Sequence, residues 1–431
     1  MHKIEYAGYL GVHRLCATHP SYQNIYNYPP EGFCFESRPT NRDHRVKQAL
    51  FGNRTYLSHE EKLFFENWEN LATEYGVLPH EISNFLSTRS PHSFSIHEDV
   101  EICCVPTNLF YFGRLPWFGL IEDYPTVFVP FTHNGKTAGL DIKDSNYVKC
   151  TKAFFKQPNF KGIITHMKST VHDLKWIFDD EDIKKKIFYV PLGFKRVDLS
   201  NRKKLNNKTI NLLITNSYGA GEGNFPLRGG IESIKAFKEA VEAGAKNIRL
   251  KICGPFNVSM YPDLHKFVHE SDTVEIEPLN FVNVDGSLHN LISEERFHQI
   301  FLDTDVLLLP AMRIHSVSSI RALAYGIPVV CSNGWGFDEF INEETGFIAV
   351  GQDGVSTWKD ENGVFREIYG IKNLGVNEKL VNSIKSILLK ISNSPEIVVE
   401  KSKKCVDYAN ENFDINKRNK LLGEVFKGML L

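Results

Sequence analysis

Arg228 is the residue of this sequence best placed to bind a diphosphate. It opens a stretch in which Ile231, Ile234 and Phe237 recur at helical spacing, which predicts a helix with one apolar face. A guanidinium forms charge-assisted, fork-shaped hydrogen bonds, and a helix N-terminus adds N–H groups without helical partners, so both suit a phosphate. The alternative is a surface arginine, which the helix macrodipole makes slightly unfavourable at that end. We therefore predict that Arg228 binds phosphate.

A second candidate phosphate site is the loop Met312–Ser319. The apolar run Val306–Leu309 predicts a buried strand before it, Ile320–Ala324 a short helix after it, and Ile327–Cys331 the next strand. In a parallel sheet the loop at the carboxyl end of a strand faces the ligand crevice. The candidate donors in this loop are His315, Ser316, Ser318 and Ser319. Two simpler interpretations stay open, namely one serine as a plain N-cap and the histidine as a surface residue.

A glycine-rich turn, Asn216–Gly223, follows the strand predicted at Ile210–Thr215. The turn has no Lys-Ser/Thr ending, so it is not a P-loop. It either lets a diphosphate approach the backbone near Asn216 and Gly219 or is only a flexible turn.

Strands and helices alternate along much of the chain, which is typical of an α/β protein with parallel sheets. Further strands are predicted at Val100–Val105, Thr126–Pro130, Lys161–Thr165, Ile187–Val190, Asn247–Cys253 and Thr273–Ile276, with a helix at His166–Phe178. The polar, basic segment Asp198–Thr209 reads as a linker between two such series. A length of 431 residues also favours two domains.

Composition excludes several classes of protein. A formal net charge of −2 at pH 7 gives no reason to expect a nucleic-acid partner. The 8 cysteines form no C-x-x-C pair, and His166 and His172 have no ligand-like spacing to Asp or Cys, so we expect core thiols, a reducing cytoplasm and no metal. No apolar run approaches the ~20 residues of a spanning helix. Peripheral contact with the inner face of a membrane stays open, because the linker is basic.

The segment after the candidate loop resembles the donor-binding segment of retaining, nucleotide-sugar-dependent glycosyltransferases with the GT-B fold (family 4-like, glycosyl transferases group 1). The residues that match the family's Ala-x-Ala-x-Gly-x-Pro-Val-Val are Ala322, Ala324, Gly326, Pro328, Val329 and Val330. Downstream, Gly336–Glu339 and Thr345–Phe347 match its Gly-x-Pro-Glu and Thr-Gly-hydrophobic pieces. The resemblance covers about residues 205 to 431 and is weak before them.

Two positions depart from the family pattern. Arg313 and Arg321 stand where the family has two glutamates, one near the donor sugar and one on the ribose hydroxyls. An arginine accepts no hydrogen bond, so it cannot do either task by the same chemistry. Each arginine either binds an anionic part of the donor or pairs with Asp338 or Glu339 as a structural ion pair.

The resemblance implies an α/β fold of two Rossmann-like domains with a cleft between them. The N-terminal domain, 1–200, is then the acceptor side, 201–405 is the donor side, and 406–431 is a helix that crosses back to the first domain. The implied function is sugar transfer, with retention, from a nucleotide-activated donor to a hydroxyl on a glycan, a lipid-linked molecule or a protein. Arg228 stands where the family has a phosphate-binding Lys, and Glu339 falls in a matching donor piece.

His133 follows a predicted strand on the acceptor side and is the candidate catalytic residue, with a buried, hydrogen-bonded histidine as the alternative. The resemblance implies no cofactor and no metal. With both glutamates replaced, the alternative function is a catalytically silent GT-B subunit that binds a sugar nucleotide or a partner enzyme.

Overall fold

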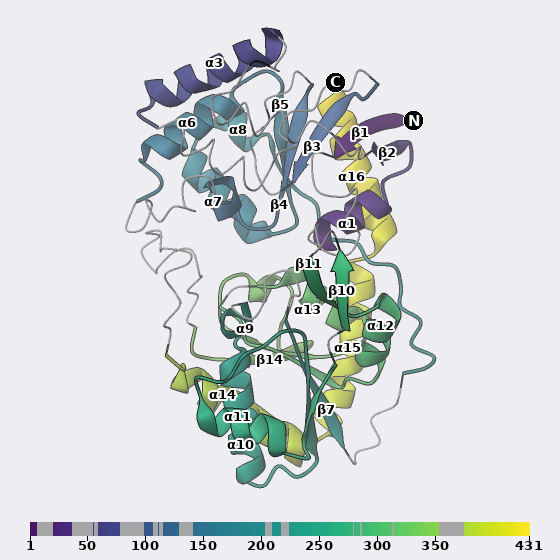
Figure 1. Ribbon diagram of the computed structural model, residues 1–431. Helices are drawn as coiled ribbons and strands as arrows, with labels where there is room; N and C mark the ends of the chain where they lie inside the picture. The colour runs from purple at the N-terminus through teal and green to yellow at the C-terminus, as the bar shows by residue number, and fades with distance from the viewer. Residues whose placement is uncertain are drawn as a thin grey trace. The chain divides into compact units, whose positions relative to one another are not determined.

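A computed structural model of the 431-residue chain shows an α/β protein built on two parallel sheets (Figure 1). It describes residues 1–6, 20–36, 55, 59–77, 99–106, 111, 115–128, 141–202, 209–216, 224–278, 280–284, 287–312, 314–352 and 375–431. The chain divides into two compact units, unit 1 (1–193, 358–371 and 415–431) and unit 2 (194–357 and 372–414).

Unit 1 is built on a six-stranded parallel sheet in the order β2-β1-β3-β4-β5-β6. Its strands are β1 (His2–Tyr6), β2 (Phe33–Glu36), β3 (Ile102–Pro106), β4 (Trp117–Ile121), β5 (Phe160–Thr165) and β6 (Ile187–Tyr189). Its described helices are α1 (Pro20–Asn27), α3 (His59–Glu74), α6 (Asn146–Phe155), α7 (Lys168–Phe178), α8 (Glu181–Lys184) and α16 (Ile415–Leu430).

The last helix of the chain, α16, contributes to the core of unit 1. Its Leu422, Phe426 and Met429 belong to one buried cluster with Ile4 of β1 and Phe118 of β4. The rings of Phe118 and Phe426 lie 5.3 Å apart, centre to centre. Helix and sheet therefore share one apolar core although they come from opposite ends of the sequence.

The strand predicted at Thr126–Pro130 is wrong over the residues that the structure describes. Tyr124–Phe128 forms a 3₁₀ helix, η1. The backbone N–H of Thr126 donates to the carbonyl of Asp123 at 3.1 Å, and its hydroxyl donates to the Asp123 carboxylate at 2.6 Å. Pro125, with its fixed φ, suits this tight turn, so local side-chain bonding overrides the strand preference of Val127 and Phe128.

Unit 2 is built on a second six-stranded parallel sheet, in the order β14-β13-β12-β7-β8-β9. Its strands are β7 (Ile210–Thr215), β8 (Ile248–Cys253), β9 (Val274–Ile276), β12 (Val306–Leu309), β13 (Val329–Ser332) and β14 (Gly346–Ala349). An antiparallel hairpin of β10 (Asn280–Val284) and β11 (Ser287–Leu291) pairs within itself, before α12.

Helices cover the sheet of unit 2. They are α9 (Asn224–Leu227), α10 (Gly230–Glu242), α11 (Pro262–Glu270), α12 (Glu294–Leu302), α13 (Ser316–Ala324), α14 (Glu378–Asn393) and α15 (Glu396–Asn412), with the short 3₁₀ helix η3 at Phe337–Glu339. The apolar stripe Ile231, Ile234 and Phe237 of α10 joins one buried cluster with Val306 and Leu308 of β12, as its periodicity predicts.

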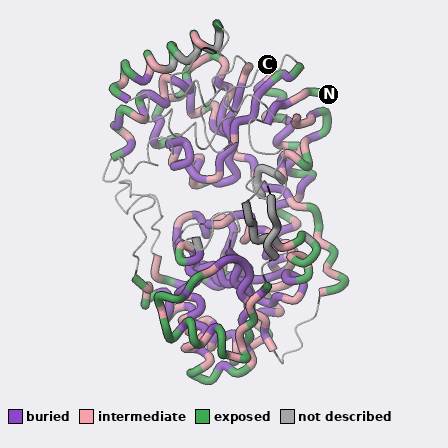
Figure 2. The backbone as a smooth tube through the Cα atoms, in the orientation of Figure 1, coloured by how far each residue is buried: buried purple, intermediate pink, exposed green. Residues whose placement is uncertain are grey.

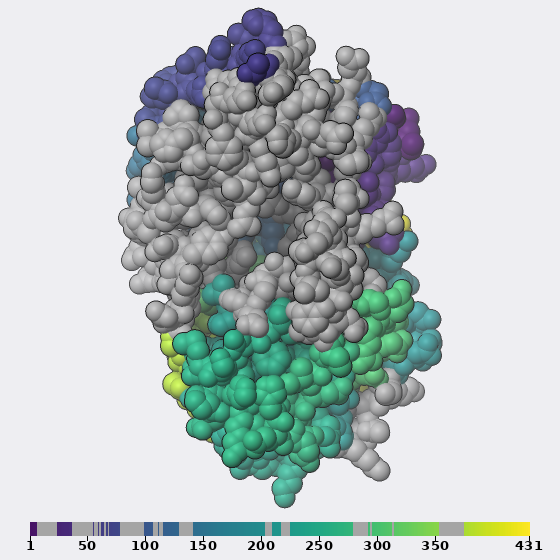
Figure 3. All heavy atoms as spheres, in the orientation of Figure 1, coloured from purple at the N-terminus to yellow at the C-terminus, as the bar shows by residue number. Residues whose placement is uncertain are grey.

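Burial follows this layering. The strands lie inside as buried backbone, and exposed segments concentrate on the outer helices (Figure 2). The visible surface of unit 2 is formed largely by the teal and green residues around α10 and α11 (Figure 3). The described cysteines are all free thiols, and all except the half-buried Cys34 are buried, as expected of core residues.

Candidate functional site

The carboxyl ends of β7 and β12 mark the topological switch point of the unit 2 sheet. From β7 the chain proceeds to β8 on one side, and it later returns to β12 on the other side. Ligands of open α/β sheets bind where two neighbouring strands send their connections in opposite directions. Thr215 and Leu309, the last residues of these two strands, therefore mark where a ligand is expected.

The side chain of Arg228 lies at this point. It is only 9% exposed, its Nη1 donates to the backbone carbonyl of Thr215 at 3.2 Å, and its Nη2 lies 3.3 Å from Nδ1 of His315. The guanidinium thus joins the end of β7 to the residue that precedes α13. The sequence proposed both residues as phosphate ligands, and the structure brings them together.

Hydrogen-bonding chemistry fixes the tautomer of His315 in this pair. A guanidinium carries donors only, so the contact requires Nδ1 of the imidazole to accept. A neutral imidazole that accepts at Nδ1 carries its proton on Nε2. His315 therefore presents an N–H donor on the ring edge away from Arg228.

Gly229 lets the Arg228 turn approach the strand end closely. Its φ is +72°, a left-handed conformation that favours glycine. A Cβ atom at this position would lie 2.5 Å from the carbonyl oxygen of Pro310, which directly follows β12. A larger residue would push the Arg228 turn away from the β12 loop.

Helix α13 begins earlier than the sequence predicts. The helix spans Ser316–Ala324, so the three serines lie in its first turns, and His315 occupies the N-cap position without a side-chain cap bond. A serine as plain N-cap is therefore wrong. The first backbone N–H groups of a helix have no intrahelical acceptor, and they lie here directly beside the Arg228 and His315 pair.

The serines differ in exposure. Ser316 and Ser319 are fully buried, whereas Ser318 is half-exposed. The Ser319 hydroxyl is a buried group with no hydrogen-bond partner among the described residues. A polar atom buried without a partner at the start of a helix is a site where a ligand oxygen or water would be stabilised.

The candidate loop is held in place by two neighbouring turns. The N–H of Met312 donates to the carbonyl of Leu227 at 3.3 Å, and the N–H of Ile314 donates to the carbonyl of Trp335 at 2.9 Å. The N–H of Trp335 in turn donates to Met312 at 3.3 Å. Sequence reasoning missed the half-exposed Trp335, although a tryptophan between two glycines, Gly334 and Gly336, is an unusual choice for a turn.

The other end of α13 is also fixed. Nη1 of Arg202 donates to the carbonyls of Tyr325 and Gly326, at 2.5 and 2.7 Å, and to the hydroxyl of Ser402 at 3.0 Å. A cation at a helix C-terminus complements the macrodipole, and burial lowers the pKa of this guanidinium. Both ends of the helix that carries the candidate site are therefore anchored.

Other predicted donor residues have contacts of a different kind. The side-chain amide of Asn216 donates to the carbonyl of Pro255 at 2.5 Å, which ties β7 to the turn after β8. The guanidinium of Arg321 lies over the ring of Phe297, 5.1 Å from its centre. The backbone carbonyl of Glu339 accepts from the hydroxyl of Tyr408 at 3.5 Å. The predicted site residues His133, Gly219 and Arg313 lie outside the described residues.

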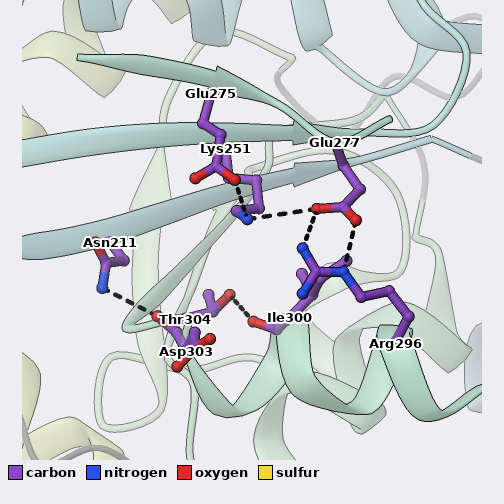
Figure 4. A network of polar contacts seen from close by, with 8 residues as sticks. All are labelled: Asn211, Lys251, Glu275, Glu277, Arg296, Ile300, Asp303 and Thr304. Carbon is purple, nitrogen blue, oxygen red and sulfur yellow. Dashed lines mark hydrogen bonds and ion pairs between the residues drawn. The ribbon is translucent and has the colours of Figure 1, made fainter. Parts of the chain in front are cut away.

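A separate cavity of about 240 Å³ lies at the opposite, amino edge of the sheet, with Asn211, Lys251 and Asp303 in its lining. The charges beside it are paired (Figure 4). Arg296 binds the carboxylate of Glu277 with two hydrogen bonds of 2.6 and 2.7 Å, and this contact lowers the pKa of Glu277. Because the polar side chains are already satisfied there, this network is structural.

Two general features of the described residues bear on the site. They contain no group of three or more His, Cys, Asp or Glu side chains that could hold a metal ion. Within the described part of the chain, no helix is both long enough and apolar enough to cross a membrane.

No model of a known protein family and no curated protein matches the sequence. Solved structures match the fold over nearly the whole chain. A glycosyltransferase from Rickettsia africae matches at a TM-score of 0.52 and 11% identity, covering 99% of this chain and 98% of that one. WaaG, a glycosyltransferase involved in lipopolysaccharide biosynthesis, matches at a TM-score of 0.52 and 13% identity, with 99% of both chains covered.

HepE of Anabaena in complex with UDP is a third match, at a TM-score of 0.51 and 10% identity, covering 99% of this chain and 100% of that one. Identities this low establish the fold alone. The chain has the two Rossmann-like sheets of the GT-B fold, which confirms the fold expected from the sequence.

Proposed function

We propose that this protein transfers a sugar from a nucleotide-activated donor to a hydroxyl acceptor, with retention of configuration. The observation that carries the proposal is the Arg228 and His315 pair, 3.3 Å apart at the N-terminus of α13 and at the switch point of the sheet. This arrangement offers a fixed cation, an imidazole donor and helix N–H groups to one anion. A diphosphate leaving group is the ligand that requires this chemistry in a sugar transferase.

In the proposed reaction the bond between the anomeric carbon and the diphosphate oxygen breaks while the acceptor oxygen bonds to the same carbon. Negative charge then develops on the diphosphate. Arg228, the Nε2–H of His315 and the first N–H groups of α13 stabilise this charge without reorganisation, which is the main way preorganised donors accelerate a reaction. No metal or cofactor is assigned a part in this step. We propose that the acceptor proton passes to His133, which the resemblance to the glycosyltransferase family places on the acceptor side.

The structural relatives support a nucleotide donor. HepE was crystallised with UDP and with UDP-glucose. We propose a nucleoside diphosphate sugar as donor, and a glycan, lipid-linked or protein hydroxyl as acceptor. A peripheral position at the inner face of a membrane would suit a lipid-linked acceptor.

Incubation with a panel of sugar nucleotides, followed by chromatography of the released nucleoside diphosphate, tests the activity. Slow donor hydrolysis that accelerates with an acceptor extract supports transfer. Thermal shift against nucleoside diphosphates tests binding separately, because a ligand at about a hundred times its Kd stabilises by about 2.7 kcal/mol.

A second function is favoured by one observation, the arginines at positions 313 and 321, where the pattern of the family that the sequence resembles has glutamates. In that case the protein is a silent subunit that binds a sugar nucleotide or a partner enzyme. Nucleotide stabilisation without hydrolysis or transfer would favour this second function. Absence of both stabilisation and turnover would refute the transferase and the nucleotide-binding subunit together.

A further inference from the structure

Two histidines on helix α11, His265 and His269, lie side by side outside the proposed donor site. Both are exposed, and their ring centres are 4.5 Å apart with the ring planes at 50°. Residues four apart on a helix project from the same face, so the pairing follows from the backbone. Two imidazoles at this spacing are also the metal-binding half of a known helical zinc motif.

Helix α11 holds the pair on a rigid support. Its neighbouring face is buried through Leu264 and Val268, and its half-buried Phe267 packs on Phe237 of α10, with ring centres 6.1 Å apart. Pro262 opens the helix at a position where proline is favoured. The two exposed imidazoles are therefore displayed on a helix that is anchored to the core of unit 2. Figure 1 shows α11 on the outside of this unit.

The separation of the rings is compatible with both imidazoles binding one metal ion. With metal–nitrogen bonds of about 2.0 to 2.1 Å and the ring centre about 1.2 Å beyond the nitrogen, imidazoles at right angles on one metal have centres about 4.6 Å apart. At the tetrahedral angle the centres would be about 5.3 Å apart. The observed 4.5 Å lies close to these values, so a small rotation of the two exposed side chains brings both imidazoles onto one metal ion. Imidazole ligands suit Cu²⁺, Ni²⁺ and Zn²⁺, and the affinity is greatest for Cu²⁺.

We propose that His265 and His269 chelate a late first-row divalent transition metal, in the order Cu²⁺ over Ni²⁺ over Zn²⁺. The described residues provide no group of three metal-ligating side chains here, so water completes the coordination. The neighbouring Lys266 and Glu270 form an ion pair, 3.9 Å apart, on the same helix. The metal binds the folded helix and so raises the melting temperature.

Titration calorimetry with Ni²⁺ on the tag-free full-length protein, in a weakly chelating buffer, tests the proposal. Loss of one imidazole removes the chelate. His265→Ala and His269→Ala should therefore each lower the affinity for the most tightly bound Ni²⁺ ion by roughly tenfold or more. His172→Ala, at another exposed histidine, should leave this Ni²⁺ affinity unchanged. Cu²⁺ added to the wild type should show two nitrogen ligands by electron paramagnetic resonance, and the single variants should show fewer.

A spacing variant separates chelation from histidine content. His269→Gln combined with Glu270→His keeps two imidazoles but places them five residues apart, about 140° around the helix. Ni²⁺ binding as tight as that of the wild type in this variant, or in His265→Ala, would overturn the proposal. Because all these positions are exposed, melting temperatures without metal should stay close to that of the wild type and show that each variant is folded.

Discussion

Nη2 of Arg228 lies 3.3 Å from Nδ1 of His315, although 87 residues separate them in the sequence. The contact is possible because β7 and β12 are adjacent parallel strands, so the segments that follow them leave the same edge of the sheet. It orients two donor groups toward the start of α13.

Replacing Arg228 with alanine should weaken binding of a nucleoside diphosphate far more than binding of its nucleoside. A charge-assisted hydrogen bond contributes about 1.5 to 3 kcal/mol, which corresponds to about ten- to a hundredfold in affinity. Calorimetry with both ligands measures the difference. Arg228→Lys is the matched control, because it keeps the positive charge and loses the fork-shaped pair of donors. Its affinity for the diphosphate should lie between those of the wild type and Arg228→Ala. Equal losses for diphosphate and nucleoside would contradict a phosphate role.

A double-mutant cycle over Arg228→Ala and His315→Ala should show coupling in diphosphate affinity. Residues in direct contact interact by about 0.5 to 3 kcal/mol, whereas distant residues are additive within about 0.5 kcal/mol. If the imidazole only fills space, the two effects will add. His315→Gln retains a donor and should recover part of the lost affinity.

Arg321→Ala should lower the stability of the protein by about 0.5 to 1 kcal/mol. The guanidinium lies over Phe297, and a half-exposed cation–π contact contributes about this amount. Denaturant unfolding of Arg321→Ala, Phe297→Leu and the double variant isolates the contact, since the second change should cost less stability once the first is made.

Placing glutamate at positions 313 and 321 together should reduce the transfer activity, and a gain of activity would favour the silent subunit.

Asp305→Asn should stabilise the protein at pH 7. Burial raises the pKa of the Asp305 carboxyl from 3.8 to about 6, against the hydrogen bond from the Asn211 N–H. The folded state therefore holds this proton more tightly than the unfolded state. The contribution of this bound proton to the free energy of unfolding is fully present below pH 3.8. It is lost as the pH rises through about 6, a change of about 3 kcal/mol.

Chemical denaturation at a series of pH values from 4 to 7.5 measures this effect. Asparagine can still accept from the Asn211 N–H, so the variant should lose the downward slope that the wild type shows over this window. The exposed Asp407→Asn provides the control and should keep the wild-type slope. An Asp305→Asn profile parallel to that of the wild type would show that the carboxylate is well solvated.

Several strands of unit 2 were predictable, because apolar runs such as Ile210–Thr215 and Val306–Leu309 are buried strands bounded by clear turns, whereas the hairpin of β10 and β11 was not predicted. The 3₁₀ helix at Tyr124–Phe128 was not predictable, because a hydrogen bond from Thr126 to the Asp123 side chain decides the local conformation. Apolar content alone could not show this.

For the candidate site, the sequence could propose single residues but not their geometry. Types and positions pointed to Arg228 and His315, but their contact depends on the strand order, which a single sequence does not specify. Trp335 was missed for the same reason, since only the bonds to Met312 and Ile314 place it beside the loop.

A polypeptide leaves the ribosome N-terminus first, at roughly 5 to 20 residues per second. Leu422 and Phe426, which complete the core of unit 1, emerge after all of unit 2. We therefore expect unit 2 to fold first, while the core of unit 1 still lacks the side chains that α16 contributes. Stalling translation of a chain in which a flexible linker, long enough to clear the ribosome, follows position 414 and probing with protease tests this order, and a protease-resistant unit 1 at that point would refute it.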